Sequence, residues 1–201
     1  LKMPVIPGFD IAGEVIEVGR KVKGFKPGDW VFARLNSLSG GASAEYAAVG
    51  EKAAALIPQG LSVKDAAAIP LAGLTALQAL RHQPDLRNGK GSGVRVLIIG
   101  ASGGVGTYAV QIAKAYGAHV TGVCSGKNVP LVKELGADEV IDYEKTSSFQ
   151  KGAHYDIIVD LVAKAPFTDH LHYLAGDGVF VSTLPTLGVI TRMVFGPLYS
   201  N

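Results

Sequence analysis

The pattern of apolar and polar positions changes near residue 60 and divides the chain into two regions. Before that point, short β-branched stretches alternate with glycine and proline turns, and no helical period is visible. We expect strands at Ile11–Val18, Trp30–Ala33 and Glu45–Val49, which is typical of a small barrel. The pattern therefore predicts one domain over residues 1–60 and a second over residues 61–201.

Two helices are predicted at the start of the second region. Asp65 is expected to N-cap the first of them, which begins at Ala66–Ile69, and Ser62 is an earlier cap candidate. The second helix follows Pro70 and runs through Thr75–Leu80.

After residue 93, strands and helices alternate along the chain. Val94–Ile99 is a short apolar run, typical of a strand that is buried on both faces. Further strands are expected at His119–Val123, Glu139–Ile141, Tyr155–Asp160 and Gly178–Ser182. Helices are expected at Thr107–Tyr116, Val129–Leu135 (with Gly136 as its stop) and Phe167–Leu174. Alternation of this kind indicates an α/β fold with a parallel sheet and right-handed crossovers.

A glycine turn joins the first of these strands to its helix. Its glycines have the spacing of dinucleotide-binding turns, in which they allow a tight bend, close approach to a pyrophosphate and close helix packing. The positive end of the helix dipole would then face the phosphates. The alternative is an ordinary glycine-rich turn. The candidate cofactor-binding residues here are Gly100, Ser102, Gly103, Gly104, Val105 and Gly106.

The same turn also matches two other enzyme motifs. Gly100–Gly104 fits the nucleophile elbow of serine hydrolases, with Ser102 as the nucleophile. Residues that could complete a triad follow downstream: Asp160, His170 and His172. A hydrolase, however, does not require Gly106, and no oxyanion-hole segment precedes the turn. The spacing of short-chain dehydrogenases also fits, but no tyrosine is followed by lysine four residues later.

The end of the next predicted strand bears on the choice of cofactor. An acidic residue there would bind a ribose 2′-hydroxyl and favour NADH, but residues 123–128 contain none. Ser125, Lys127 and Asn128 could instead bind a 2′-phosphate, which favours NADPH. The alternative is that Lys127 is an exposed loop lysine. Tyr143 could pack near the adenosine or be an ordinary aromatic residue at a strand end.

Composition excludes several classes of protein. The net charge of +2 does not indicate a nucleic-acid partner, and 48% hydrophobic with 18% charged residues excludes a disordered chain. Cys124 is the single cysteine, so neither an internal disulfide nor a cysteine-rich zinc cluster can form. The longest uncharged runs, residues 66–80 and 97–113, are shorter than the ~20 apolar residues of a membrane span.

Taken together, these segments resemble the zinc-free medium-chain dehydrogenases/reductases of the quinone oxidoreductase branch. The residues that carry the resemblance are Ile6–Val15, Val18–Gly19, Phe25–Val31, Ala44–Tyr46, Ala66–Pro70, Ala72–Leu77, Gly100–Gly106 and Leu135–Asp138. It implies a partial GroES-like barrel over residues 1–60 and a Rossmann NADP-binding domain, lacking its last strand, over residues 61–201. The cofactor would lie in the cleft between them. On this comparison we expect the chain to be an internal fragment of a longer protein.

The resemblance also gives roles to individual residues. It places Thr75 near the nicotinamide and Val162 and Leu184 along the cofactor cleft. The proton could come from water or from Tyr46, which could face the substrate; otherwise Tyr46 is an ordinary half-buried strand tyrosine. Zinc-containing relatives carry Gly-His-Glu where this chain has Gly8-Phe9-Asp10, so no metal is expected.

The expected activity is zinc-independent, NADPH-dependent hydride transfer to quinones or other α,β-unsaturated carbonyls. The alternatives are an NADPH-binding protein without catalysis, as some members of this family are, and a serine hydrolase that uses Ser102. A small-molecule substrate is expected and no nucleic acid. The resemblance is compatible with a homodimer and with either a cytoplasmic or a peripheral chloroplast location.

Overall fold

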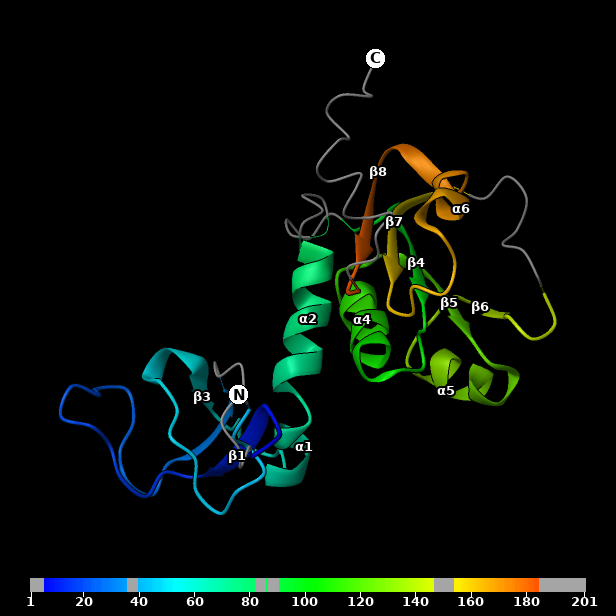
Figure 1. Ribbon diagram of the computed structural model, residues 1–201. Coiled ribbons are helices and arrows are strands. Elements are labelled where there is room, and N and C mark those ends of the chain that lie inside the picture. Colours follow the sequence, from blue (N-terminus) through cyan, green and yellow to red (C-terminus); the bar gives the residue numbers. More distant parts are fainter. Residues whose placement is uncertain (1–5, 36–39, 82–85, 87–90, 147–153, 185–201) are drawn as a thin grey trace. The chain divides into compact units, whose positions relative to one another are not determined.

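The computed structural model describes residues 6–35, 40–81, 86, 91–146 and 154–184 (Figure 1). The chain forms two compact units, Leu1–Leu74 and Thr75–Asn201. Within the described residues, none of the helices has both the length and the apolar character needed to cross a bilayer.

The first unit contains a small antiparallel sheet with the strand order β1-β2-β3. Its elements are β1 (Asp10–Glu14), β2 (Trp30–Arg34), a 3₁₀ turn (Glu51–Ala53), β3 (Ala54–Leu56) and α1 (Val63–Ala67). Helix α2 (Pro70–Arg81) begins in this unit and starts at its proline, as predicted. Both carboxylate oxygens of Asp10 accept the N–H of Leu71, at 3.1 Å, so a negative charge lies on the first turn of α2.

Two expectations for this unit are wrong. Glu45–Val49 forms no strand, and most of these residues are exposed; the strand that pairs with β2 is Ala54–Leu56. A strand requires hydrogen-bonding partners. Ala54–Leu56 has little β propensity, but its pairing with β2, in the register Ala33↔Ala54, supplies these partners. Strand β1 also ends at Glu14 and does not reach Val18.

The predicted cap of α1 is also wrong. The helix begins at Val63, and the hydroxyl of Ser62 accepts the N–H of Asp65 at 3.1 Å. Ser62 is therefore the N-cap, the earlier of the two candidates, and Asp65 lies inside the first turn. The Asp65 carboxylate accepts the Ser62 hydroxyl at 2.6 Å, so the two side chains bind each other across that turn.

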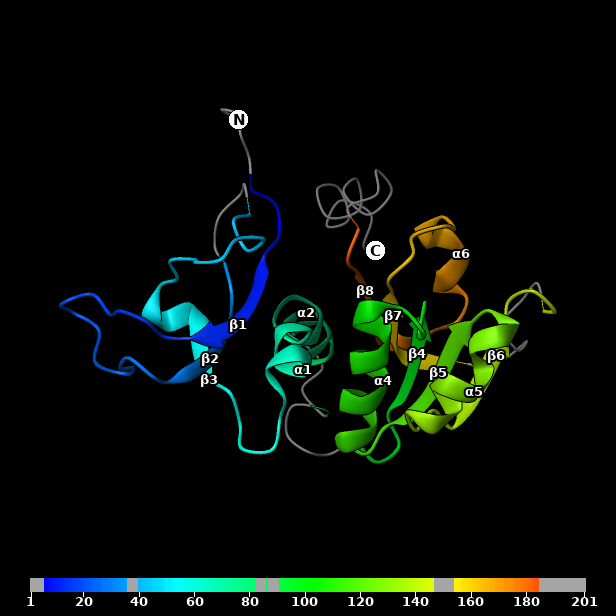
Figure 2. The ribbon, with the colours of Figure 1, turned by 90° about the horizontal axis from the view of Figure 1, so that it is seen from below.

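The second unit is a doubly wound parallel sheet, which confirms the predicted fold class. Its strand order is β6-β5-β4-β7-β8, and every neighbouring pair is parallel. Its elements are β4 (Arg95–Ile99), α4 (Gly104–Ala115), β5 (His119–Cys124), a 3₁₀ turn (Gly126–Asn128), α5 (Val129–Glu134), β6 (Glu139–Asp142), β7 (Tyr155–Asp160), α6 (Phe167–Leu171) and β8 (Leu174–Ser182). Figure 2 shows α4 and α5 on one side of the sheet and α6 on the other.

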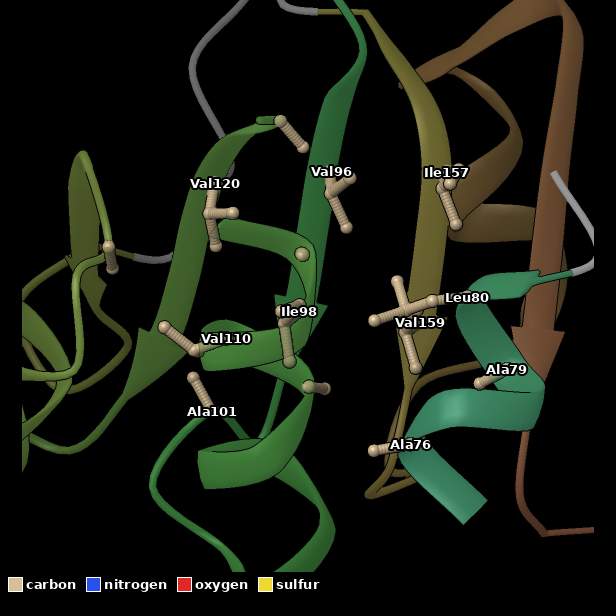
Figure 3. Close-up of a cluster of buried hydrophobic side chains, with 14 of the residues drawn as sticks. Ala76, Ala79, Leu80, Val96, Ile98, Ala101, Val110, Val120, Ile157 and Val159 are labelled. Carbon is tan, nitrogen blue, oxygen red and sulfur yellow. The ribbon is translucent and has the colours of Figure 1, made fainter. Parts of the chain in front are cut away.

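Apolar side chains cover both faces of this sheet. Val96 and Ile98 point to the face covered by α4, and Leu97 points to the opposite face; all three are fully buried. Figure 3 shows the first cluster, in which strand residues pack against α4 and the C-terminal part of α2. Its labelled members are Ala76, Ala79, Leu80, Val96, Ile98, Ala101, Val110, Val120, Ile157 and Val159. The second cluster joins Leu97, Val123, Tyr155 and Ile158.

Asp138 ties the end of α4 to the start of β5. Its carboxylate accepts the Lys114 ammonium at 2.8 and 2.9 Å and the N–H of Val120 at 2.7 Å. Burial alone would raise the pKa of Asp138, but the hydrogen bonds from Lys114 and Val120 outweigh it and hold the pKa below its ordinary value. The ionised carboxylate therefore stabilises the native state.

We expect Asp138→Asn to lower the free energy of unfolding at neutral pH by about 1–2 kcal/mol, because the contact is partly exposed. A lowered pKa in the native state gives stability that is fully present above about pH 4 and lost as the pH falls through the native value. The difference between parent and variant in urea unfolding should therefore shrink on acidification. Asp177→Asn, at an exposed position of β8, is the control. An equal loss at neutral and acid pH would contradict this assignment.

Candidate functional site

A pocket of about 870 Å³ lies at the carboxyl ends of the parallel strands. Gly100 follows β4, Ser125 follows β5, Tyr143 follows β6 and Val162 follows β7, and all four line it. Strands β4 and β7 are neighbours whose crossovers run to opposite faces of the sheet. The pocket therefore lies at the topological switch point, where open α/β sheets bind their ligands.

The glycine turn has a different constraint at each glycine. Gly100 has φ +86°, a conformation that residues with a side chain rarely adopt. Gly103 is the N-cap of α4, and its N–H donates to the carbonyl of Gly100 at 3.0 Å. A Cβ on Gly106 would collide with the carbonyl oxygen of Gly100 and the backbone of Ala101. The turn is thus tight at its start, and its helix packs directly on it.

Eight predicted cofactor residues line this pocket: Gly100, Ser102, Gly103, Ser125, Lys127, Asn128, Tyr143 and Val162. The others do not line it. Gly104, Val105 and Gly106 form the first turn of α4, and Thr75 is a half-buried residue of α2. Leu184 is exposed beyond the end of β8. Tyr46, the candidate proton donor, is not among the predicted cofactor residues; it is exposed and belongs to the first unit.

One amide connects the polar residues of the pocket. The Asn128 side-chain NH₂ donates to the hydroxyl of Ser102 at 3.1 Å and to that of Ser125 at 3.0 Å. Each hydroxyl keeps a proton to donate, because it accepts in these bonds. Lys127, which is exposed, adds a positive charge at the rim. These donors suit an anionic ligand such as a phosphate.

The same geometry argues against a serine nucleophile. Ser102 binds an amide, which cannot act as a general base. Among the described residues other than glycine, only Ala163 has a positive φ, so Ser102 lacks the strained backbone of a nucleophile elbow. The hydrolase alternative therefore has no geometric support at Ser102.

Asp160 shapes the wall of the pocket next to Gly100. Its buried carboxylate accepts the N–H of Val162 at 3.0 Å and that of Ala163 at 2.8 Å, which holds Ala163 at φ +50°. The other carboxylate oxygen lies 3.7 Å from Nε2 of His170, which is also buried. The turn packs the Val162 side chain against Gly100. A Cβ added to Gly100 would lie 2.8 Å from Cγ2 of Val162. From the sequence, Asp160 and His170 are predicted only as possible members of a hydrolase triad with Ser102.

Two carboxylates beside the pocket were missed altogether. The Glu144 carboxylate accepts the N–H of Gly126 at 3.1 Å, and a Cβ on Gly126 would be 2.7 Å from Oδ2 of Asp142. Asp142 is the last residue of β6, and Glu144 follows two residues later; β6 is the strand next to β5. The sequence pattern for an acidic residue that binds the ribose 2′-hydroxyl applies only to the end of β5. The acidic residues on either side of Tyr143 are visible in the sequence, but only the pairing of β5 with β6 places them beside Gly126.

No group of three or more histidine, cysteine or acidic side chains suited to a metal ion occurs within the described part of the chain. Cys124 lines the pocket, but burial, and then the nearby charge of Asp142, raises the pKa of its thiol. The thiol therefore stays protonated at neutral pH and is a poor nucleophile and metal ligand.

Comparisons with known proteins agree over most of the chain. A family model described as zinc-binding dehydrogenase matches residues 104–183, and one described as alcohol dehydrogenase GroES-like domain matches residues 1–59. The chain is 45% identical over 189 residues to the chloroplast envelope quinone oxidoreductase homolog of Arabidopsis thaliana. That match covers 92% of the chain but only 57% of the relative.

Two solved structures have the same fold. The quinone oxidoreductase from Coxiella burnetii superimposes with a TM-score of 0.79 at 30% identity, covering 99% of this chain and 62% of that one. The yhdH oxidoreductase from Salmonella enterica, in complex with NADP, superimposes with a TM-score of 0.74 at 26% identity, covering 96% of this chain and 62% of that one.

Proposed function

The chain belongs to the medium-chain dehydrogenase/reductase family, and on that basis we propose that it binds NADPH and reduces quinones or other α,β-unsaturated carbonyls. The observation that carries the proposal is a pocket that joins the glycine turn to the cationic rim at Lys127. The quinone oxidoreductase relatives support the substrate class, and the NADP complex of the Salmonella protein supports the cofactor.

The residues of the pocket fit a dinucleotide. The backbone at Gly100 and Gly103 would admit the pyrophosphate, and Lys127 would neutralise a 2′-phosphate. Tyr143 would cover the adenosine. The bound cofactor would supply the hydride, and the chain would bind and orient it.

The remaining assignments rest on the family resemblance. Thr75 and Leu184 would lie toward the nicotinamide. Water is the proposed proton source, with Tyr46 as the alternative donor.

We propose that the reaction needs no metal. Phe9 stands where zinc-containing relatives carry histidine, and its ring lies 6.0 Å from the Arg34 guanidinium. The neighbouring Asp10 carboxylate is engaged on the N–H of Leu71. Neither side chain in this segment is therefore placed to ligate zinc.

The direct test is turnover of 1,2-naphthoquinone or a simple enone with NADPH, in the presence and absence of a chelator. NADPH oxidation that depends on the substrate and resists the chelator is expected. Tight NADPH binding without oxidation in the presence of either substrate would instead favour an NADPH-binding protein without catalysis. Loss of turnover with the chelator would overturn the metal-free proposal.

We expect Lys127→Ala to weaken NADPH binding about tenfold, because a charge-assisted contact to the 2′-phosphate is lost. Binding of NADH, which has no 2′-phosphate, should be nearly unchanged. Calorimetric titration with both cofactors measures the difference, which salt should reduce because the contact is exposed. Lys133→Ala, an exposed lysine of α5 outside the pocket, is the matched control. Equal weakening of both cofactors would make Lys127 a structural residue.

A further inference from the structure

The turn after β5 carries opposing charges within a few residues. Lys127 lies on the rim of the pocket, next to Gly126, whose N–H donates to the Glu144 carboxylate at 3.1 Å. Asp142 packs against the same glycine, and the Lys145 ammonium lies 3.6 Å from its carboxylate. The ammonium of Lys145 thus lies beside Asp142, whereas Glu144 binds the backbone N–H of the residue immediately before Lys127.

Glu144 is fixed in place by its neighbours. The N–H of Glu144 donates to the Asp142 carboxylate at 3.0 Å, and the N–H of Tyr143 donates to the carbonyl of Cys124 at 3.2 Å. Strand β6 pairs with β5 up to Cys124↔Asp142, so the segment that carries Glu144 continues directly from the sheet. These contacts fix the backbone of residues 142–144 beside the β5 turn, and the bond from the Gly126 N–H holds the Glu144 carboxylate there.

This position matters for the part of the cofactor that distinguishes NADPH from NADH. In folds of this type the ribose 2′ position lies at the end of the second strand, here at Ser125 and Lys127. A carboxylate near it repels a 2′-phosphate and accepts a hydrogen bond from a 2′-hydroxyl. The bond to Gly126 occupies one lone pair of Glu144, and the other acceptor sites remain for a hydroxyl.

Building on the proposed function, we propose that Glu144 determines cofactor selectivity at this pocket. Its carboxylate offsets the attraction of Lys127 for the 2′-phosphate and supplies, from the turn after β6, the acidic group that the end of β5 lacks. The chain would then bind both cofactors, with a smaller preference for NADPH than Lys127 alone would give.

The test is Glu144→Gln, which keeps the acceptor for the Gly126 N–H and removes only the charge. The ratio of the dissociation constants of NADH and NADPH should rise about fivefold, mainly because NADPH binds more tightly. The increase should diminish at high salt, because it is electrostatic. Glu134→Gln, at an exposed position of α5 outside the pocket, removes the same charge and should leave the ratio unchanged.

The outcomes separate this inference from the proposed function. If the parent protein binds neither cofactor, the proposed function fails and the inference fails with it. Suppose that Lys127→Ala weakens NADPH binding but that Glu144→Gln, like Glu134→Gln, leaves the ratio of the NADH and NADPH dissociation constants unchanged. The cofactor site is then supported, and the role of Glu144 is overturned. A fall in the ratio on Glu144→Gln would also overturn it, since the carboxylate would then be favouring NADPH.

Discussion

Gly103→Val is expected to weaken NADPH binding at least a hundredfold while the parallel sheet stays folded. Gly103 is exposed, lines the pocket and caps α4, where the pyrophosphate would approach the backbone. Its backbone, at φ −80° and ψ 173°, is extended and accessible to valine. An added Cβ would have one protein contact within 4 Å, with the Gly100 carbonyl oxygen at 3.3 Å. The branched side chain therefore obstructs the ligand far more than it disturbs the protein.

Calorimetric titration with NADPH measures the loss, and thermal unfolding of the protein without ligand shows that the fold is kept. A drop of only a few degrees in Tm is expected, since valine is a poor N-cap. An unchanged dissociation constant would remove the turn from the proposed site. Unfolding of the variant would instead show that Gly103 is needed by the structure.

Gly106→Ala is expected to have the opposite signature, a loss of about 3 kcal/mol in the free energy of unfolding. The Cβ would meet the Gly100 carbonyl oxygen and the Ala101 backbone, which are main-chain atoms that cannot rotate away. Helix α4 would have to move off β4, and it packs there through fully buried residues such as Ala109 and Val110.

The matched control is Gly104→Ala in the same helix. A Cβ at Gly104 meets no protein atom within 4 Å, so the substitution should change stability by less than about 1 kcal/mol. Urea unfolding of both variants without ligand provides the comparison. Equal stability of Gly106→Ala and Gly104→Ala would contradict the close contact between α4 and the turn.

The parallel sheet was predictable because burial on both faces leaves a direct trace in the sequence. Strand β4 must fill both layers of the core, so Val96, Leu97 and Ile98 are consecutive apolar residues. The first unit leaves no such trace. Ala54–Leu56 is a strand because of its partner β2, and Glu45–Val49 has more β-like residues but no strand partner among the described residues. Pairing of this kind depends on the tertiary structure and cannot be inferred from local composition.

The candidate site shows the same division. The glycine spacing and the polar residues after β5 lie within short segments, and the structure places most of them around one pocket. Glu144 and Asp160 could not be assigned in this way, because their contacts depend on which strands are neighbours. The register Cys124↔Asp142 brings Glu144 to Gly126, and the β4–β7 pairing brings the Asp160 turn to Gly100. Sequence separation gives no indication of either contact.

The central place of β4 has a consequence for the order of folding. Its pairing with β5 closes after one helix, whereas its pairing with β7 closes only after the chain has passed through α5 and β6. Because a longer loop costs more entropy to close, we expect the β4–α4–β5 unit to form before β7 docks. The glycine turn belongs to that early unit, but Asp160 and Val162 complete the pocket only with the late strand. On this order of folding, we expect a ligand in the pocket to act mainly by slowing unfolding and so to lengthen the lifetime of the native state.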